Sequence, residues 1–274
     1  MRPRTLAVDD AGVGEPLVLI PGGVTGWLSW IPHQERLRDR YRTIRVQPIH
    51  NELGSAGQPG DPSYTREVAV ESLLLTLDHL EIQQAHFAGW SAGGKGLLDF
   101  AIVHADRLRS VTLVEPAANW VLEAAGESDQ EQHESTEFLH SLAGREVTES
   151  DLARFLYIAG FVSDPSQART DPYWERAWPH RMTLSWLSEK LMGSDHTIAD
   201  LAAVTCPVLL TKGTRTGSAE RRIVDLLGLH LPHAKVVEFE GTHAHHIESM
   251  DRFLETLEAH LQASRPRDGK RAPL

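Results

Sequence analysis

Short apolar runs alternate with longer segments of helical periodicity in both outer parts of the chain. The runs 17–20, 111–114 and 208–211 are almost entirely apolar, which is typical of strands buried on both faces. Over 65–80, apolar residues such as Val68, Leu73 and Leu77 recur at helical spacing. Strands alternating with helices predict an α/β fold, a mostly parallel sheet flanked by helices.

The same patterns place the remaining elements of this sheet. We expect further strands at 5–8, 41–46, 85–90 and 235–240, and further helices at 33–40, 92–104, 219–229 and 248–261. The segment 47–62 is rich in Gly, Pro, Asn and Ser and is expected to be a loop.

The pattern changes between residues 117 and 200, where no strand is expected. Helical patterns occur near 119–125, 133–143, 149–159 and 172–192. We therefore expect an all-helical insertion, a cap or lid at 117–200, between two parts of one α/β core at 1–116 and 201–274. The insertion is rich in aromatic residues, most of which are expected to form its own core. The tail 263–274 is rich in Pro, Arg and Lys and is expected to be disordered.

The stretch 85–94, Ala-His-Phe-Ala-Gly-Trp-Ser-Ala-Gly-Gly, joins an expected strand to an expected helix through Gly-x-Ser-x-Gly. A sharp turn of this kind exposes the Ser91 hydroxyl at the carboxyl end of the sheet. Side chains at Gly89 and Gly93 would collide with the adjoining strand and helix. The helix that follows offers unpaired N–H groups and the positive end of its dipole. The context predicts a site-forming serine.

A serine hydroxyl needs a base to take its proton and a third group to orient that base. Three histidines follow the last expected strand: His243, His245 and His246. His243 is preferred because it comes first after the strand, whereas His246 already begins the next helix. The His-x-His-His cluster lacks an accompanying Cys or a His-Glu-x-x-His helix, so no metal and no cofactor are expected.

These features together resemble the α/β-hydrolase-fold proteins over nearly all of 5–262. The resemblance rests on Pro21-Gly22-Gly23, the Gly89–Gly93 turn, the helical insertion, and Gly241-Thr242-His243 followed by Glu248. It implies that Ser91 is the nucleophile and His243 the base. It also implies an oxyanion hole made by the N–H of Ala92 and one N–H from Gly23 or Val24.

The acid of the triad departs from the pattern of most such proteins. Thr216 occupies the position where Asp is usual, and threonine cannot stabilise an imidazolium by charge. Some members carry the acid after the preceding strand, where this chain has Glu115 followed by Pro116. Glu115 is therefore the preferred acid, with Glu220 or a Ser–His dyad without an acid as alternatives.

The resemblance implies a serine hydrolase acting on an ester, thioester or lactone. The tryptophans of the insertion and the acidic charge balance favour a mainly apolar or aromatic small molecule as its substrate. The candidate pocket residues are Trp27, Trp90, His50, Trp120 and Trp186. A serine at the turn argues against reactions that need a carboxylate nucleophile there. Carbon–carbon bond hydrolysis, perhydrolysis and cofactor-free cyclisation remain open. So does a slow-turnover binding or sensor protein, for which Thr216 is the best support.

Composition narrows the classes of partner and compartment. The formal net charge of −11 argues against binding to nucleic acid. Cys206 is the only cysteine, so no internal disulfide can form. No apolar run approaches membrane-spanning length and the N-terminus lacks a long apolar segment. A cytoplasmic protein without a membrane span is expected, and a homodimer remains open.

Overall fold

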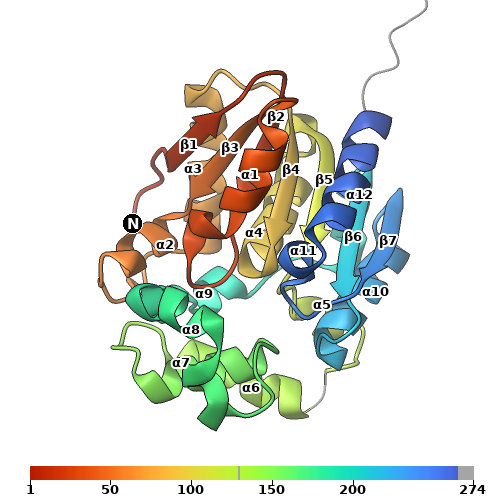
Figure 1. The fold of residues 1–274 in the computed structure, drawn as a ribbon. Helices are drawn as coiled ribbons and strands as arrows, with labels where there is room; N and C mark the ends of the chain where they lie inside the picture. Colours follow the sequence, from red (N-terminus) through yellow and green to blue (C-terminus); the bar gives the residue numbers. More distant parts are fainter. Residues whose placement is uncertain (129, 265–274) are drawn as a thin grey trace, which may run out of the picture.

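A seven-stranded sheet forms the centre of the molecule (Figure 1), seen here in a computed structural model that describes residues 1–128 and 130–264. Its strand order is β1-β3-β2-β4-β5-β6-β7, and every neighbouring pair is parallel except β1 with β3. The strands are β1 Ala7–Ala11, β2 Glu15–Ile20, β3 Tyr41–Gln47, β4 Ala85–Trp90, β5 Leu108–Val114, β6 Val208–Gly213 and β7 Ala234–Phe239. The predicted α/β class is confirmed.

Helices cover both faces of this sheet, and alternate residues of each strand point to opposite covers. In β2, Leu17 and Leu19 pack in the cluster that contains α1 and α12, whereas Val18 and Ile20 pack in the cluster that contains α3, α4 and α10. These helices are α1 Ile31–Leu37, α3 Arg66–His79, α4 Ser91–Val103, α10 Ser218–His230 and α12 Met250–Ala263. Short segments complete the core: η1 Gly26–Trp30, η2 Ala105–Arg107, η5 Ile198–Ala203 and α11 His245–Glu248.

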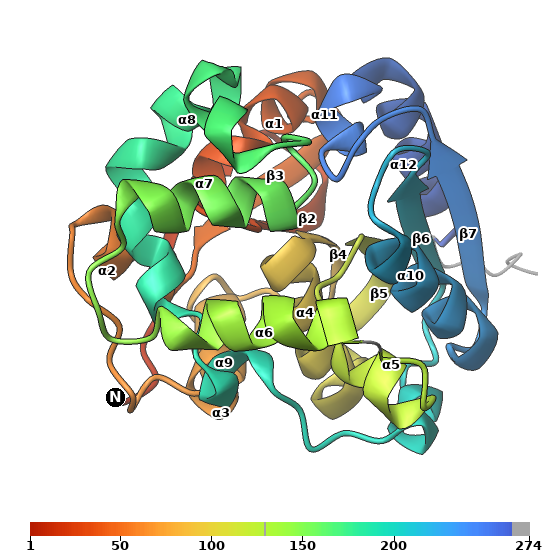
Figure 2. The same cartoon turned by 90° about the horizontal axis from the view of Figure 1, so that it is seen from below.

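Between β5 and η5 the described residues form helices and no strand. The elements are α5 Trp120–Ala124, α6 Gln130–Ser141, α7 Glu149–Ile158, η3 Pro165–Thr170, α8 Pro172–Ala177, η4 Trp178–Trp186 and α9 Glu189–Met192. Helices α6, α7 and α8 lie across the end of the sheet at which the parallel strands finish (Figures 1 and 2). Segment 117–200 is called the cap below. Its position covers the edge where Ser91 begins α4.

One expected loop is wrong, because helix α2 occupies Ile49–Ser55. Glycine, proline and polar residues around it suggested irregular structure. The helix forms because it packs against η4 of the cap: a side chain at Gly54 would lie 2.5 Å from the Thr183 backbone. A contact between segments about 130 residues apart thus decides its conformation, and no local pattern reports it.

The bounds of two elements differ from those expected. The edge strand β1 lies later than the expected 5–8, at Ala7–Ala11, and α12 extends to Ala263. The expected disordered tail otherwise lies outside the described residues. Within the described ranges no helix combines the length and apolar character needed to cross a bilayer.

Candidate active site

Ser91 sits at the strained junction between β4 and α4. Its φ of 54° lies in the left-handed region, which residues other than glycine seldom adopt. Close packing leaves room only for glycines around it. A Cβ at Gly22 would lie 2.8 Å from the Ser91 Cβ, one at Gly89 would lie 2.8 Å from the Gly93 carbonyl oxygen, and one at Gly93 would collide with Pro21. The Gly-x-Ser-x-Gly sequence folds into a sharp turn that holds the serine at the sheet edge.

Glu115 and His243 form a buried pair at the same edge. The imidazole Nδ1 and the Glu115 Oε2 are 2.5 Å apart, and Glu115 is 1% exposed. The other oxygen, Oε1, accepts a hydrogen bond of 2.6 Å from the Gly213 N–H at the end of β6. Glu115 has a positive φ of 39°, the second strained position in this cluster. The ends of strands β5 and β6 therefore hold the carboxylate in place, and the carboxylate in turn holds the Nδ1 edge of the imidazole.

Contact between the two groups shifts the pKa of His243 and the pKa of Glu115 in the directions that favour an ion pair. Burial alone would lower the pKa of His243, but the hydrogen bond and negative charge of Glu115 outweigh it and the pKa is raised. Burial would raise the pKa of Glu115, but His243, His245 and the Gly213 amide together hold it below its ordinary value. The carboxylate thus stays ionised and stabilises a proton on the imidazole.

Hydrogen bonds tie Ser91 into the same cluster through its neighbours. The Trp90 indole N–H donates to the His243 carbonyl oxygen at 3.0 Å, and the Ala117 N–H donates to the Ser91 carbonyl oxygen at 3.0 Å. Among the hydrogen bonds of the described residues, none joins the Ser91 hydroxyl directly to His243. Such contacts in serine enzymes often tighten only with substrate in place.

Two other positions bear on the identity of the acid: Thr216, where Asp is usual, and Glu220, the alternative acid. Thr216 is buried beside Gly213, and its hydroxyl has no hydrogen-bond partner within the described part of the chain. Glu220 acts on His243 through its charge, which contributes the smallest of the influences on that pKa. The structure therefore brings Glu115, and not Thr216 or Glu220, against the imidazole.

The amides expected to form an oxyanion hole flank Ser91 from two sides. Ala92 is the second residue of α4, at the helix end that carries unpaired N–H groups. Gly23 has a φ of 59°, and its carbonyl oxygen accepts a 3.1 Å hydrogen bond from the Asn51 side chain. The Val24 carbonyl oxygen accepts from the Thr183 hydroxyl of the cap at 3.3 Å. Side chains from α2 and η4 thus hold the loop that faces the serine.

A family model for the alpha/beta hydrolase family matches residues 17–256. The chain belongs to the alpha/beta hydrolase family. The resemblance seen in the sequence is confirmed by this match, which includes the Gly22–Gly23 loop, Ser91, Glu115 and His243.

This chain resembles two relatives and one solved structure that are named as hydrolases. It is 38% identical over 108 residues to 2-hydroxymuconate semialdehyde hydrolase of Pseudomonas sp. (strain CF600); the match covers 38% of this chain and 38% of that relative's length. It is 25% identical over 258 residues to RutD of Stutzerimonas stutzeri (strain A1501), provisionally assigned as a carbamate hydrolase, covering 90% and 91% of the two chains. The meta-cleavage product hydrolase CumD of Pseudomonas fluorescens IP01 shares the fold, with a TM-score of 0.70, 19% identity and 94% coverage of both chains.

The five candidate pocket residues of this α/β-hydrolase family member lie in different surroundings. Trp90 is buried behind His243, and Trp27 is half-buried beside Arg45. Trp120 is buried in the core on the α3–α4 side, while the Trp186 indole N–H donates to the Gln58 carbonyl oxygen. His50 alone of the five lines the cavity next to α4. Trp90, Trp120 and Trp186 are buried and therefore serve mainly to pack the interior.

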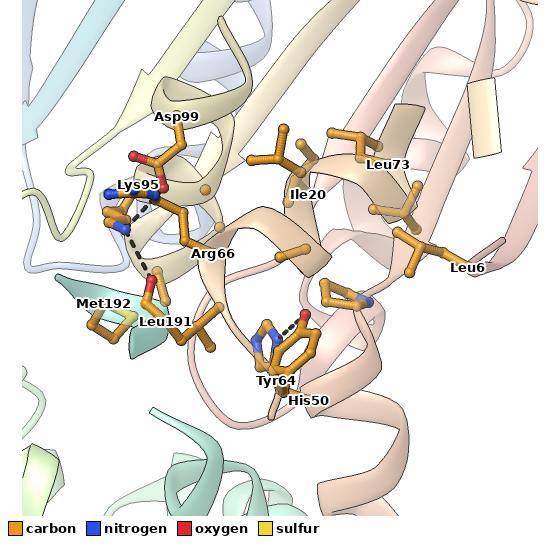
Figure 3. Close-up of a pocket in the computed structure, with 17 residues that line it drawn as sticks. Leu6, Ile20, His50, Tyr64, Arg66, Leu73, Lys95, Asp99, Leu191 and Met192 are labelled. Carbon is orange, nitrogen blue, oxygen red and sulfur yellow. Dashed lines mark hydrogen bonds and ion pairs between the residues drawn. The ribbon is translucent and has the colours of Figure 1, made fainter. Parts of the chain in front are cut away.

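That cavity, of about 60 Å³, lies between α2, α3, α4 and α9 (Figure 3). Ala92 and Gly93 of α4 line it, as does His50, which contacts the Tyr64 hydroxyl at 3.3 Å. Most other lining residues are apolar: Leu6, Ile20, Val46, Val70, Leu73, Leu191 and Met192. Ser91, Glu115 and His243 do not line it, so the cavity adjoins the catalytic candidates through Ala92 without containing them.

A buried ion pair closes one end of the cavity, and the sequence reading did not single it out. Lys95 Nζ lies 2.8 Å from Asp99 Oδ2 and donates to the Leu191 carbonyl oxygen at 2.9 Å (Figure 3). It also donates to the Gly193 carbonyl oxygen at 2.8 Å. Burial lowers the pKa of Lys95 and raises that of Asp99, each against the attraction of its partner. All three donors of the ammonium group are used. Lys95 therefore ties the chain leaving the cap to α4.

His33 and His246 form a second buried cluster, behind Trp90. Their rings stack at 5.3 Å, and neither nitrogen of His246 has a hydrogen-bond partner within the described residues. Burial lowers the pKa of His33 to about 3 and that of His246 well below its ordinary value. Both rings are therefore neutral in the folded protein, where His246 packs as an aromatic side chain.

This burial predicts acid sensitivity of the fold. The unfolded chain takes up these protons near pH 6.5 and the folded chain does not, so stability is complete above pH 6.5 and falls as the pH drops below it. For His33 the loss between pH 6.5 and 5.0 is about 2 kcal/mol, and His246 adds a loss in the same direction. Urea unfolding at both pH values should show that His246→Phe loses less stability than wild type between pH 6.5 and 5.0. His133→Phe, at an exposed position on α6, should recover nothing; an equal loss in wild type and His246→Phe would contradict this account.

Two cap aromatics approach the site, and the sequence reading did not assign them to it. Phe161 stacks on Tyr173 at 4.6 Å with 5° between the ring planes, and its ring also meets His243 edge-on at 6.3 Å. The Tyr173 hydroxyl lies 3.5 Å from the Thr25 hydroxyl. The sequence placed both residues in the helical insertion, with only Tyr173 in an expected helix, and only the way the cap docks determines that they face the sheet edge.

Proposed function

We propose that this protein is a serine hydrolase that cleaves an ester, thioester or lactone of a mainly apolar small molecule through an acyl-enzyme on Ser91. The Glu115–His243 contact of 2.5 Å is the observation that carries the proposal. It supplies a charged partner for the imidazole in a chain that has threonine at the usual acid position. The alternative of a dyad without an acid has less support for the same reason.

In the first half-reaction His243 takes the proton from the Ser91 hydroxyl while the Ser91 oxygen attacks the carbonyl carbon. The carbonyl oxygen becomes an oxyanion, which the N–H of Ala92 and the N–H of Gly23 or Val24 bind. Each such donor contributes about 3 kcal/mol in other enzymes. The bond to the leaving group then breaks, and His243 returns its proton to that group. Glu115 stabilises the imidazolium that exists between these steps.

In the second half-reaction water replaces the alcohol or thiol. His243 removes a proton from water as the water oxygen attacks the acyl carbon, and when the intermediate collapses His243 gives that proton to the departing Ser91 oxygen. The carboxylic acid leaves and the starting state is restored. The strained φ of Ser91 supports this role, since it keeps the side chain at the sheet edge through both steps.

The surroundings favour an apolar substrate. Phe161 of the cap meets His243 edge-on and stacks on Tyr173, and the cavity that begins at Ala92 has mostly apolar walls. The ammonium group of Lys95 is saturated by Asp99 and two carbonyl oxygens, so this buried cation is a poor binding group for a substrate carboxylate.

A second candidate reaction is hydrolysis of a carbon–carbon bond. The relative with 38% identity is named 2-hydroxymuconate semialdehyde hydrolase, and CumD, with the same fold, is named a meta-cleavage product hydrolase. The same serine, histidine and acid would serve this reaction, which differs in its leaving group.

Steady-state assays on p-nitrophenyl acetate, p-nitrophenyl butyrate and 2-hydroxymuconate semialdehyde separate the two candidates. We expect turnover of the esters with saturation, and slower or no loss of the dienol chromophore. Preferential loss of the chromophore would instead support carbon–carbon hydrolysis. Turnover of none of the three above the Ser91→Ala background would contradict the proposed function and favour a binding protein.

A further inference from the structure

The Tyr173 side chain crosses from the cap to the loop that faces Ser91. Tyr173 lies on α8, where its own N–H donates to the Asp171 carboxylate at 2.7 Å and fixes the start of the helix. Its hydroxyl lies 3.5 Å from the Thr25 hydroxyl and 3.5 Å from the position that a Cβ at Gly23 would take. The backbone N–H groups of Val24 and Thr25 also face the phenol oxygen. This hydroxyl therefore sits on the loop expected to bind an oxyanion.

Shared neighbours connect Tyr173 to Ser91 on one side and to His243 on the other. Gly22 lies against the Ser91 Cβ, and Gly23, the next residue, lies beneath the Tyr173 hydroxyl. On the other side, Phe161 stacks flat on the Tyr173 ring and meets His243 edge-on. Tyr173 thus lies against the loop on one side and against Phe161, which meets the imidazole, on the other.

The protonation of this phenol suits a hydrogen-bond donor. Burial raises the pKa of Tyr173 above its ordinary value, although Thr25, the Val24 and Thr25 amides and Arg176 oppose the shift. The hydroxyl therefore keeps its proton at neutral pH.

We propose that Tyr173, delivered by the cap, donates a hydrogen bond to the oxyanion formed during attack by Ser91, beside the N–H groups of Ala92 and Gly23. The inference rests on the proposed function. No proton is transferred: the phenol keeps its hydrogen, and the negative oxygen accepts it while the tetrahedral intermediate exists. Because the donor belongs to α8, the complete set of donors exists only when the cap is docked on the Gly22–Thr25 loop.

Tyr173→Phe tests the donor because it removes the hydroxyl and keeps the ring that stacks on Phe161. We expect kcat on p-nitrophenyl butyrate to fall about 100-fold with KM changed less than about threefold. Tyr157→Phe is the matched control, since Tyr157 is a cap tyrosine that is 44% exposed, and it should match wild type. Melting temperatures of all three proteins check that the cap remains folded.

A trifluoromethyl ketone inhibitor separates a donor from a structural residue, because Ser91 converts the ketone to a hemiketal oxyanion. The Ki of an aryl trifluoromethyl ketone should rise about 100-fold in Tyr173→Phe, while the Ki of the product acid should not change. Thr25→Val, which keeps the tyrosine and removes its partner hydroxyl, should raise the ketone Ki a few-fold. An unchanged ketone Ki in both variants, or a faster Tyr173→Phe, would overturn this inference and leave the proposed function intact. A wild-type protein that neither hydrolyses esters nor binds the ketone would overturn both.

Discussion

Ser91→Ala should lower kcat/KM for ester hydrolysis by about 10⁴-fold or more. The substitution removes the oxygen that would attack the carbonyl carbon, and in a well-studied serine protease loss of the serine alone costs about as much as loss of the whole triad. The remaining rate would come from the amides of Ala92 and Gly23 and from substrate binding. The measurement is steady-state hydrolysis of p-nitrophenyl butyrate, with the melting temperature as a check on folding.

Ser150→Ala gives the matched control. Ser150 lies on α7 of the cap with an exposed side chain, far in sequence from the strained turn. Its rate should equal that of wild type. A Ser91→Ala protein that is folded and retains more than about one-tenth of the wild-type rate would show that the hydrolysis proceeds without this hydroxyl.

Glu115→Gln should lower kcat/KM by about 10⁴-fold, as the corresponding change does in a well-studied triad. The amide keeps a similar shape but removes the charge that stabilises the imidazolium. Glu115 raises the pKa of His243 and burial lowers it. Without the carboxylate the burial effect remains, so the pKa of His243 falls. The acid limb of the pH–rate profile should therefore move to lower pH.

Glu220→Gln separates this account from the alternative acid. Glu220 also raises the pKa of His243, but as the smallest contribution. We expect a change of at most a few-fold in rate and a smaller shift of the acid limb in the same direction. A large loss in Glu220→Gln together with a small loss in Glu115→Gln would assign the acid to Glu220 instead. Small losses in both would favour a dyad.

The turn at Ser91 could be predicted because its chemistry is local. Gly89, Ser91 and Gly93 lie within five residues, between a strand and a helix that periodicity reveals. His243 followed from the order of elements, since residues after parallel strands gather at one edge of the sheet. Glu115 followed from the resemblance, because some α/β-hydrolase-fold proteins carry the acid after the preceding strand when the usual position, here Thr216, lacks it. The 2.5 Å contact itself depends on the register of β5 and β6, which the sequence does not state.

The parts that could not be predicted depend on the docking of the cap. Helix α2 forms against η4, Lys95 binds the carbonyl oxygens of Leu191 and Gly193, and Tyr173 reaches Thr25. Each contact joins segments that are distant in sequence. Aromatic content indicated an apolar cap but not which rings face the site, and Trp90 packs behind His243 where a pocket wall was expected. Periodicity identifies which residues are buried but not which partner buries them.

The central claim is that the Ser91 hydroxyl is made nucleophilic by His243 and Glu115. Peptide mass spectrometry after reaction with a fluorophosphonate tests it most directly. We predict one phosphonyl group on Ser91 in wild type, much slower labelling in Glu115→Gln, and none in Ser91→Ala. A label on another residue, or equal labelling rates in wild type and Glu115→Gln, would contradict the account.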